Sequence, residues 1–146
     1  MARLAYLSRR ETFSASHRLH LPTLSERENR DLFGKCSHVH GHGHNYTLLV
    51  TVRGPVDAAT GMVMNLVELK QIIHRTVLDK VDHRHLNLDV PEFATLNPTA
   101  ENIACVIWQW LAPSLGGLLF EVQLQETENN IAVYRSDESD RPHSRL

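Results

Sequence analysis

The chain has 146 residues, 42% hydrophobic and 22% charged, which is the composition of an ordinary globular protein with enough chain for one core. A net charge of −2 argues against nucleic acid or a membrane surface as the main partner, and no apolar run approaches the roughly 18 residues of a membrane span. Without an apolar signal core, and with only two cysteines, we expect a single cytoplasmic domain over residues 1–146 with reduced thiols.

The first predicted element is a strand from about Leu4 to Leu19. Its period of two places Phe13, Ala15 and His17 on one face, so His17 lies on the apolar side of the strand. Alone, such a histidine is more often a core residue satisfied by a hydrogen bond than a ligand. A short exposed helix or a loop is expected over residues 25–33, where most side chains are charged.

A histidine-rich segment follows, with four of the ten histidines and Cys36 between Leu32 and Tyr46. His42 and His44 lead into a second predicted strand and share a face, with Cα atoms roughly 6.5 Å apart. Two imidazoles on one face suit a metal ion, and His17 is then the best third ligand. Three histidines with an open fourth position are typical of catalytic zinc. Cys36 is either the fourth ligand of a structural site or a reactive thiol.

Two helices are predicted in the second half of the chain. Asn65 is a plausible N-cap for an amphipathic helix to about Lys80, and Thr99 for a second helix that Pro113 and the following glycines end. Between them, Asp82 and His83 form either a polar helix-to-loop transition or the proton partner that a reactive cysteine needs. A loop is expected over residues 91–98.

The last predicted element is a hairpin with strands over residues 118–127 and 130–134, before a polar tail expected to be disordered over residues 136–146. Glu126 shares a face with Val122 and Leu124. A carboxylate on an apolar face costs several kcal/mol unless it is paired. Glu126 therefore either bends out at the turn or waits for a ligand rich in hydrogen-bond donors.

Taken together, six segments resemble 6-pyruvoyl-tetrahydropterin synthase. They are residues 13–19, 32–46, 60–66, 81–83, 98–102 and 126–131. The resemblance implies an α+β tunnelling fold, a four-stranded antiparallel sheet with two helices on one face. In that family three subunits close a β-barrel and two trimers stack, so a homohexamer with active sites at subunit interfaces is expected. The implied reaction converts 7,8-dihydroneopterin triphosphate to 6-pyruvoyl-tetrahydropterin with loss of triphosphate, in tetrahydrobiopterin biosynthesis.

The resemblance also implies roles for single residues. Zn²⁺ would be held by His17, His42 and His44. The general base would be Cys36, with Asp82 and His83 completing its relay from a neighbouring subunit. The pterin would be anchored by Glu126, in a pocket that Thr99 and Glu101 line. The triphosphate would meet one of three candidates, namely Arg18, Lys35 and Arg84.

Three alternatives stay open at this point. His40 and His42 also form a spaced pair after Cys36, and this shorter gap resembles 6-carboxy-tetrahydropterin synthase of the queuosine pathway. We favour the longer gap because Asn45 and Tyr46 follow His44. An aldolase-like side activity on dihydroneopterin is the second alternative. The third is a non-catalytic, zinc-stabilised pterin-binding module in which Cys36 completes a four-ligand site.

Overall fold

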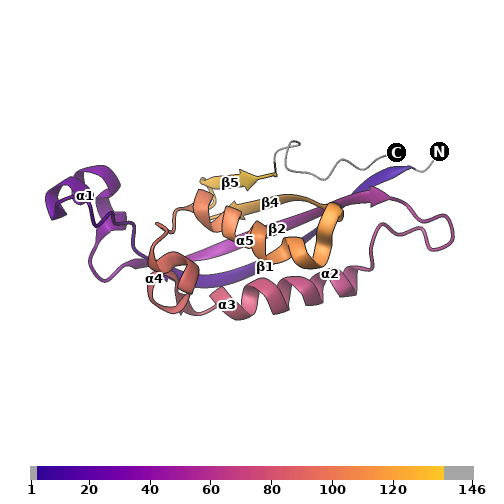
Figure 1. Ribbon diagram of the computed structural model, residues 1–146, viewed down its shortest axis with the longest axis horizontal. Helices are drawn as coiled ribbons and strands as arrows, with labels where there is room; N and C mark the ends of the chain where they lie inside the picture. The colour runs from indigo at the N-terminus through magenta and orange to yellow at the C-terminus, as the bar shows by residue number, and fades with distance from the viewer. Residues whose placement is uncertain (1–2, 137–146) are drawn as a thin grey trace.

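The computed structural model describes residues 3–136 and contains one mixed five-stranded sheet (Figure 1). Its strands are β1 (Leu4–His17), β2 (His42–Pro55), β3 (Arg84–His85), β4 (Leu119–Gln125) and β5 (Ile131–Tyr134), in the order β3-β1-β2-β4-β5. The expected four antiparallel strands are present as β1, β2, β4 and β5.

The prediction of a purely antiparallel, four-stranded sheet is wrong at the outer edge of β1. There β3 pairs parallel with residues 15–16 of β1. A strand of two residues is too short for an alternating pattern, so the sequence around Arg84 and His85 reads as a loop. This small strand matters because it fixes the segment that carries Asp82 and His83 against the sheet.

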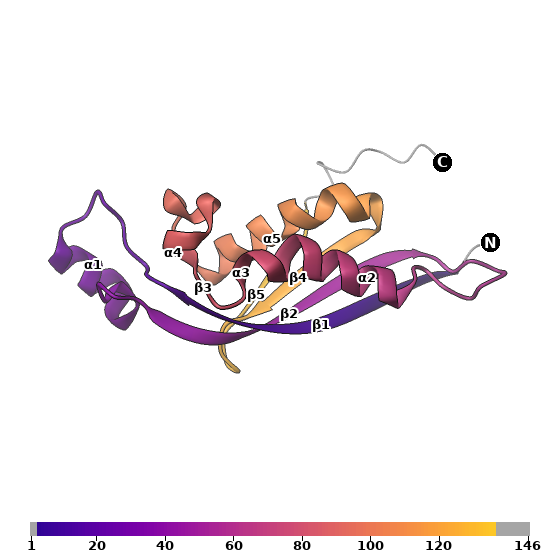
Figure 2. The ribbon, with the colours of Figure 1, turned by 90° about the horizontal axis from the view of Figure 1, so that it is seen from below.

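Two long helical rods cover one face of the sheet, as predicted, and leave the other face bare (Figure 2). The first consists of α2 (Leu66–Ile73), a π-helical segment η2 (His74–Leu78) and α3 (Asp79–Val81). The second is α5 (Ala100–Leu115). The side chains of Asn65 and Thr99 accept hydrogen bonds from the backbone at the two helix starts, which confirms both predicted N-caps.

Of the two predicted stop signals for the second helix, the glycines at 116–117 are confirmed and Pro113 is wrong, because Pro113 lies inside α5 and the helix continues to Leu115. Proline removes only one backbone donor, and that loss is tolerable in the last turn. The helix stops at Gly116, whose φ of +53° is a left-handed conformation that glycine adopts readily.

The remaining elements are short. They are α1 (Glu26–Phe33), η1 (Gly34–Ser37), α4 (Leu86–Asp89), η3 (Pro91–Ala94) and η4 (Gly116–Leu118). Ser25 and Glu28 form a capping box at the start of α1, which confirms the predicted short helix. The loop expected over residues 91–98 contains η3. The tail expected over residues 136–146 lies outside the described residues apart from Ser136.

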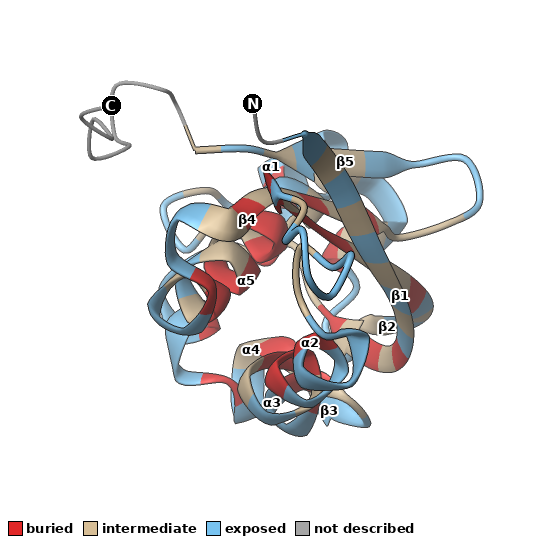
Figure 3. Cartoon of the chain, turned by 90° about the vertical axis from the view of Figure 1, so that its right-hand side faces the viewer, coloured by how far each residue is buried: buried red, intermediate tan, exposed pale blue. Residues whose placement is uncertain are grey.

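The core lies between the sheet and the two rods, where buried residues gather in Figure 3. Tyr46, Leu48, Val50 and Val52 of β2 are all 0% exposed. Because these residues alternate along β2, the same buried face continues to His44 and His42 at the start of the strand. None of the helices in residues 3–136 is both long and apolar enough to span a bilayer.

Candidate functional site

Three histidines converge at the end of the β1–β2 pair, where the sequence predicts a metal site. The antiparallel register sets His17 opposite His42 and Ala15 opposite His44. One potential ligand atom of each imidazole lies within 4.8 Å of those of the other two. The ring centroids are 4.7–5.1 Å apart. Among residues 3–136, no other histidine joins this group.

The chemistry of the three imidazoles fits a metal ion. His17 is fully buried, and its Nδ1 donates a hydrogen bond of 2.8 Å to the carbonyl oxygen of Pro98. A carbonyl only accepts, so Nδ1 carries the proton and Nε2 keeps its lone pair. Nε2 of His17, Nε2 of His44 and Nδ1 of His42 are buried without a hydrogen-bond partner. Three buried nitrogen atoms that lack a partner are what zinc would satisfy.

The charge state of these side chains also suits a metal. Burial and the neighbouring histidines lower the pKa of His17 to about 4, against the weaker opposing effect of its bond to Pro98. Burial, together with His44, also lowers the pKa of His42. Neutral imidazoles are the form that coordinates a metal ion, so protons compete little with the metal at neutral pH.

Tyr46 lies two residues after His44, on the same face of β2 as the candidate metal ligands. Its ring stacks on Phe13 with centroids 4.8 Å apart, and its hydroxyl lies 3.4 Å from Nδ1 of His17. Burial raises the pKa of this phenol, with smaller contributions from Glu126 and Cys36. The hydroxyl therefore stays neutral beside the three histidines.

Cys36 lies in η1, which the exit of β1 holds in place. The backbone N–H of Leu19 donates to the carbonyl of Cys36 at 2.8 Å, and Nε of Arg18 donates to the carbonyl of Ser37 at 3.0 Å. The thiol is half-buried and free. Burial and the charge of Glu126 raise its pKa. In the chain alone, its surroundings therefore differ from the cationic environment that the sequence suggests for a reactive thiolate.

Glu126 follows β4 directly and lies beside His44, which favours the inward placement over the alternative of bending out at the turn. Its Oε1 lies 3.7 Å from Nε2 of His44, and its side chain is only 16% exposed. Its backbone N–H donates to the carbonyl of Asn130 across the hairpin turn. The carboxylate is thus fixed beside the candidate metal centre with oxygen atoms left to accept hydrogen bonds.

Asp82 and His83 are held at the sheet edge by the backbone of Ser14. The N–H of Ser14 donates to Oδ1 of Asp82 at 3.0 Å, and the N–H of His83 donates to the carbonyl of Ser14 at 2.7 Å. The bond from Ser14, more than the neighbouring His83, lowers the pKa of Asp82. Nδ1 of His83 lies 3.0 Å from Oδ1 of Asp82.

The backbone of His83 is in the left-handed region, with φ of +60°, and its side chain is 83% exposed. A non-glycine residue in this region costs of order 1 kcal/mol or more and persists only where its surroundings enforce it. The result is an exposed imidazole with a carboxylate behind it. Within the described residues it makes no contact with Cys36.

Two other predicted site residues lie at the start of α5. Thr99 is the N-cap, and its hydroxyl accepts from the N–H of Asn102 at 3.2 Å, so the capping interpretation of this residue is confirmed. Glu101 is exposed in the first turn. His38 and His40 are also exposed, with ring centroids 5.7 Å apart, and they stay outside the group of three histidines.

Two contributions to the site have no signal in the sequence. The carbonyl oxygen of Pro98 orients His17, and every residue has such an oxygen. Gly41 has a φ of +73°, and a Cβ there would lie 2.7 Å from the carbonyl oxygen of His17 and 3.0 Å from Nε2 of His85. Only glycine fits this turn before His42. The only feature of the sequence that pointed to this glycine was its position between His40 and His42.

Comparison with known proteins agrees with the geometry. The sequence pattern of the family 6-pyruvoyl tetrahydropterin synthase matches residues 6–137. The chain is 52% identical to 6-pyruvoyl tetrahydrobiopterin synthase of Drosophila melanogaster over 134 residues, 90% of this chain and 80% of that protein. The Homo sapiens protein of the same name is 50% identical, over 91% of this chain and 92% of that protein.

A solved structure shows the same fold. The 6-pyruvoyl tetrahydropterin synthase of Caenorhabditis elegans superimposes with a TM-score of 0.88 at 42% identity, covering 92% of this chain and 96% of that one. Sequence and structure thus agree over nearly the whole length of the chain. The chain therefore belongs to the 6-pyruvoyl tetrahydropterin synthase family.

Proposed function

We propose that the chain converts 7,8-dihydroneopterin triphosphate to 6-pyruvoyl-tetrahydropterin and triphosphate, a step of tetrahydrobiopterin synthesis. The observation that carries this proposal is the group of three converging imidazoles with a carboxylate beside it. Three histidine ligands leave a position open for a substrate oxygen. The relatives' names supply the pterin, and the site supplies groups that suit it.

In this proposal each residue has one role. His17, His42 and His44 hold Zn²⁺, which when bound makes the protons on the hydroxyl-bearing carbons of the substrate more acidic. The thiolate form of Cys36 would accept such a proton and become the neutral thiol. The carboxylate of Glu126 accepts the N–H donors of the pterin ring and so orients the side chain towards the metal.

The proton relay requires a second copy of the chain. His83 is 83% exposed, and no contact joins it to Cys36 within residues 3–136, so we assign Asp82 and His83 to the cysteine of a neighbouring subunit. A nearby imidazolium would also lower the pKa of Cys36, opposing the effects of burial and Glu126. Thr99 and Glu101 then border the pterin, Thr99 through its backbone because its hydroxyl caps α5.

The edges of the sheet favour such an assembly. β3 pairs with only two residues of β1, which leaves the edge of β1 over residues 4–13 without a strand partner among the described residues. At the opposite edge of the sheet, β5 is the last strand within residues 3–136. Large apolar side chains are exposed on both edge strands. They are Leu4, Tyr6, Ile131 and Val133, each more than half exposed. Open edges of this kind are templates for pairing, and we propose a barrel of three copies and a hexamer of two such trimers.

Product analysis tests the reaction. Purified, zinc-loaded protein is incubated anaerobically with dihydroneopterin triphosphate, and both triphosphate and the pterin are identified. We expect triphosphate and a 6-pyruvoyl product in equal amounts. A 6-carboxy product would shift the proposal to the carboxy-pterin synthase, and bound pterin without turnover would reduce it to a binding module.

A mixing experiment tests the shared site. Cys36→Ala and His83→Ala are each expected to be inactive alone, because each lacks one half of every site. Co-assembled at equal amounts, they regain about a quarter of wild-type activity, since random pairing restores both halves at that fraction of interfaces. If cysteine and histidine act within one chain, every mixture stays inactive.

A further inference from the structure

A shallow depression of about 390 Å³ lies where β3 joins β1, and none of the roles above uses it as a binding site. The polar side chains around it come from β1, β2 and the segment that contains β3. They belong to Ser14, Ser16, His44, Asn45, His83, Arg84 and His85. The depression therefore adjoins the candidate metal site through His44, whereas Cys36 and Glu126 do not line it.

Hydrogen-bond donors without a partner surround this depression. The hydroxyl of Ser14 donates to Oδ1 of Asn45 at 2.6 Å, which turns the amide nitrogen of Asn45 outward with no partner in residues 3–136. Arg84 is exposed and forms no ion pair or hydrogen bond with any described residue. Nδ1 of His85 is buried without a partner, and it donates in the tautomer that carries its proton on this atom.

The acidic groups nearby are already engaged. Asp82 accepts from the N–H of Ser14 and lies against Nδ1 of His83. Asp89 accepts from the backbone N–H of His85 at 2.8 Å. Both carboxylates are therefore engaged with the backbone of the sheet edge, while the guanidinium of Arg84 and the amide nitrogen of Asn45 have no hydrogen-bond partner among the described residues. A multiply charged anion matches such a surface.

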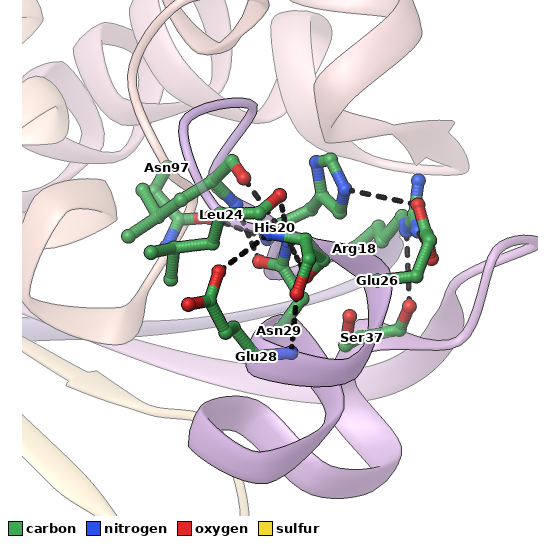
Figure 4. A network of polar contacts seen from close by, with 10 residues as sticks. Arg18, His20, Leu24, Glu26, Glu28, Asn29, Ser37 and Asn97 are labelled. Carbon is green, nitrogen blue, oxygen red and sulfur yellow. Dashed lines mark hydrogen bonds and ion pairs between the residues drawn. The ribbon is translucent and has the colours of Figure 1, made fainter.

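The other two basic candidates for a phosphate contact are placed differently. Arg18 is held by its own chain, with Nε donating to the carbonyl of Ser37 at 3.0 Å and Nη2 lying 3.5 Å from Glu26 (Figure 4). Lys35 is exposed on η1 and does not line the depression. Arg84 alone combines a free guanidinium with neighbouring donors.

We propose that this depression is a phosphoryl-binding site in which Arg84, Ser16 and Asn45 hold the triphosphate chain of the substrate. The identity of the ligand as a substrate group rests on the proposed function, whereas its chemical class rests on the donors. Because His83 borders the same depression, the leaving group is held beside the imidazole that serves the neighbouring subunit's cysteine. Arg84 is thereby a binding residue for the polyphosphate and not a base.

The test uses zinc-loaded, full-length protein and inorganic triphosphate as the probe, with binding measured by calorimetry. Arg84→Gln is expected to weaken triphosphate binding roughly tenfold or more, the usual effect of losing a charge-assisted contact to phosphate. Ser16→Ala weakens it less. Arg75→Gln is the matched control, because Arg75 is an exposed arginine on η2 that does not line the depression. Zinc content is assayed before and after each titration, since triphosphate also chelates zinc.

Arg84→Gln is further expected to raise the KM for dihydroneopterin triphosphate with unchanged zinc content, while Arg75→Gln changes neither quantity. Equal triphosphate affinity in Arg84→Gln and wild type would overturn the proposal, even if the enzyme turns over normally. The proposal would also be overturned if His17→Ala abolished triphosphate binding while Arg84→Gln left it intact, because the anion would then be bound to the metal. Triphosphate binding that depends on Arg84 in a protein without turnover would support the site and refute the proposed reaction.

Discussion

Replacing His44 and His40 separately by alanine tests which histidines hold the metal. The two lie in one segment, yet His44 has a buried Nε2 without a hydrogen-bond partner, whereas His40 is exposed and faces His38. Zinc sites with four protein ligands bind with roughly 10–16 kcal/mol, or about 3–4 kcal/mol for each ligand. Losing His44 should therefore weaken zinc binding about 10²- to 10³-fold.

His40→Ala should leave the zinc affinity unchanged, because His40 does not belong to the group of three converging imidazoles. Competition against a chelating dye at pH 7 measures both variants, and circular dichroism confirms that each is folded. An equal loss in the two variants, or a loss only in His40→Ala, would refute the assignment. The second result would also restore the shorter spacing of the carboxy-pterin synthase.

Three further predictions concern the same region. Cys36→Ala should retain zinc and assembly but lose turnover; loss of zinc, by metal analysis, would instead make Cys36 a structural ligand. Gly41→Ala should lower the free energy of unfolding by at least about 2 kcal/mol, from a left-handed φ and a clash with His17. Gly61→Ala, with the same φ of +73° and open space around it, should cost only about 1 kcal/mol, and equal losses in urea unfolding would contradict the clash. The metal-free protein should lose stability between pH 6.5 and about 4, because unfolded His17 binds a proton that the folded form excludes. The loss is about 2 kcal/mol at pH 5 relative to pH 7, and a flat profile, or one that His17→Gln leaves unchanged, would count against this cause.

The positions of the main site residues followed from strand periodicity. His17, His44 and Glu126 each lie on the buried side of a strand, and the period of two identifies that side without knowledge of the fold. The same reasoning located both long helices, because their N-caps and apolar stripes are local. A spacing of four residues, as from Ile73 to Val77 to Val81, is compatible with both α- and π-helix. The sequence pattern therefore did not distinguish the π-helical segment from a continuous α-helix.

Features that depend on distant residues could not be predicted. The tautomer of His17 is set by Pro98, 81 residues away in the chain. The left-handed backbone of His83 depends on hydrogen bonds to Ser14. No pattern in the sequence around His83 predicts these bonds. The raised pKa of Cys36 likewise arises from burial in the folded chain and, to a smaller extent, from Glu126, 90 residues further along the sequence. Periodicity gives the side of an element on which a residue lies but not the atoms that it meets there.

The three converging histidines all belong to β1 and β2, two neighbouring strands of a single chain. A newly made polypeptide can therefore capture its metal as soon as these strands pair, before it encounters another copy. Under the proposed sharing of the relay between subunits, the exposed His83 would serve a cysteine only after that encounter. Maturation of the enzyme would accordingly proceed in two separable stages, metal capture by the free subunit followed by the onset of activity on assembly. Dilution that separates the subunits should therefore abolish the activity while each subunit keeps its bound metal.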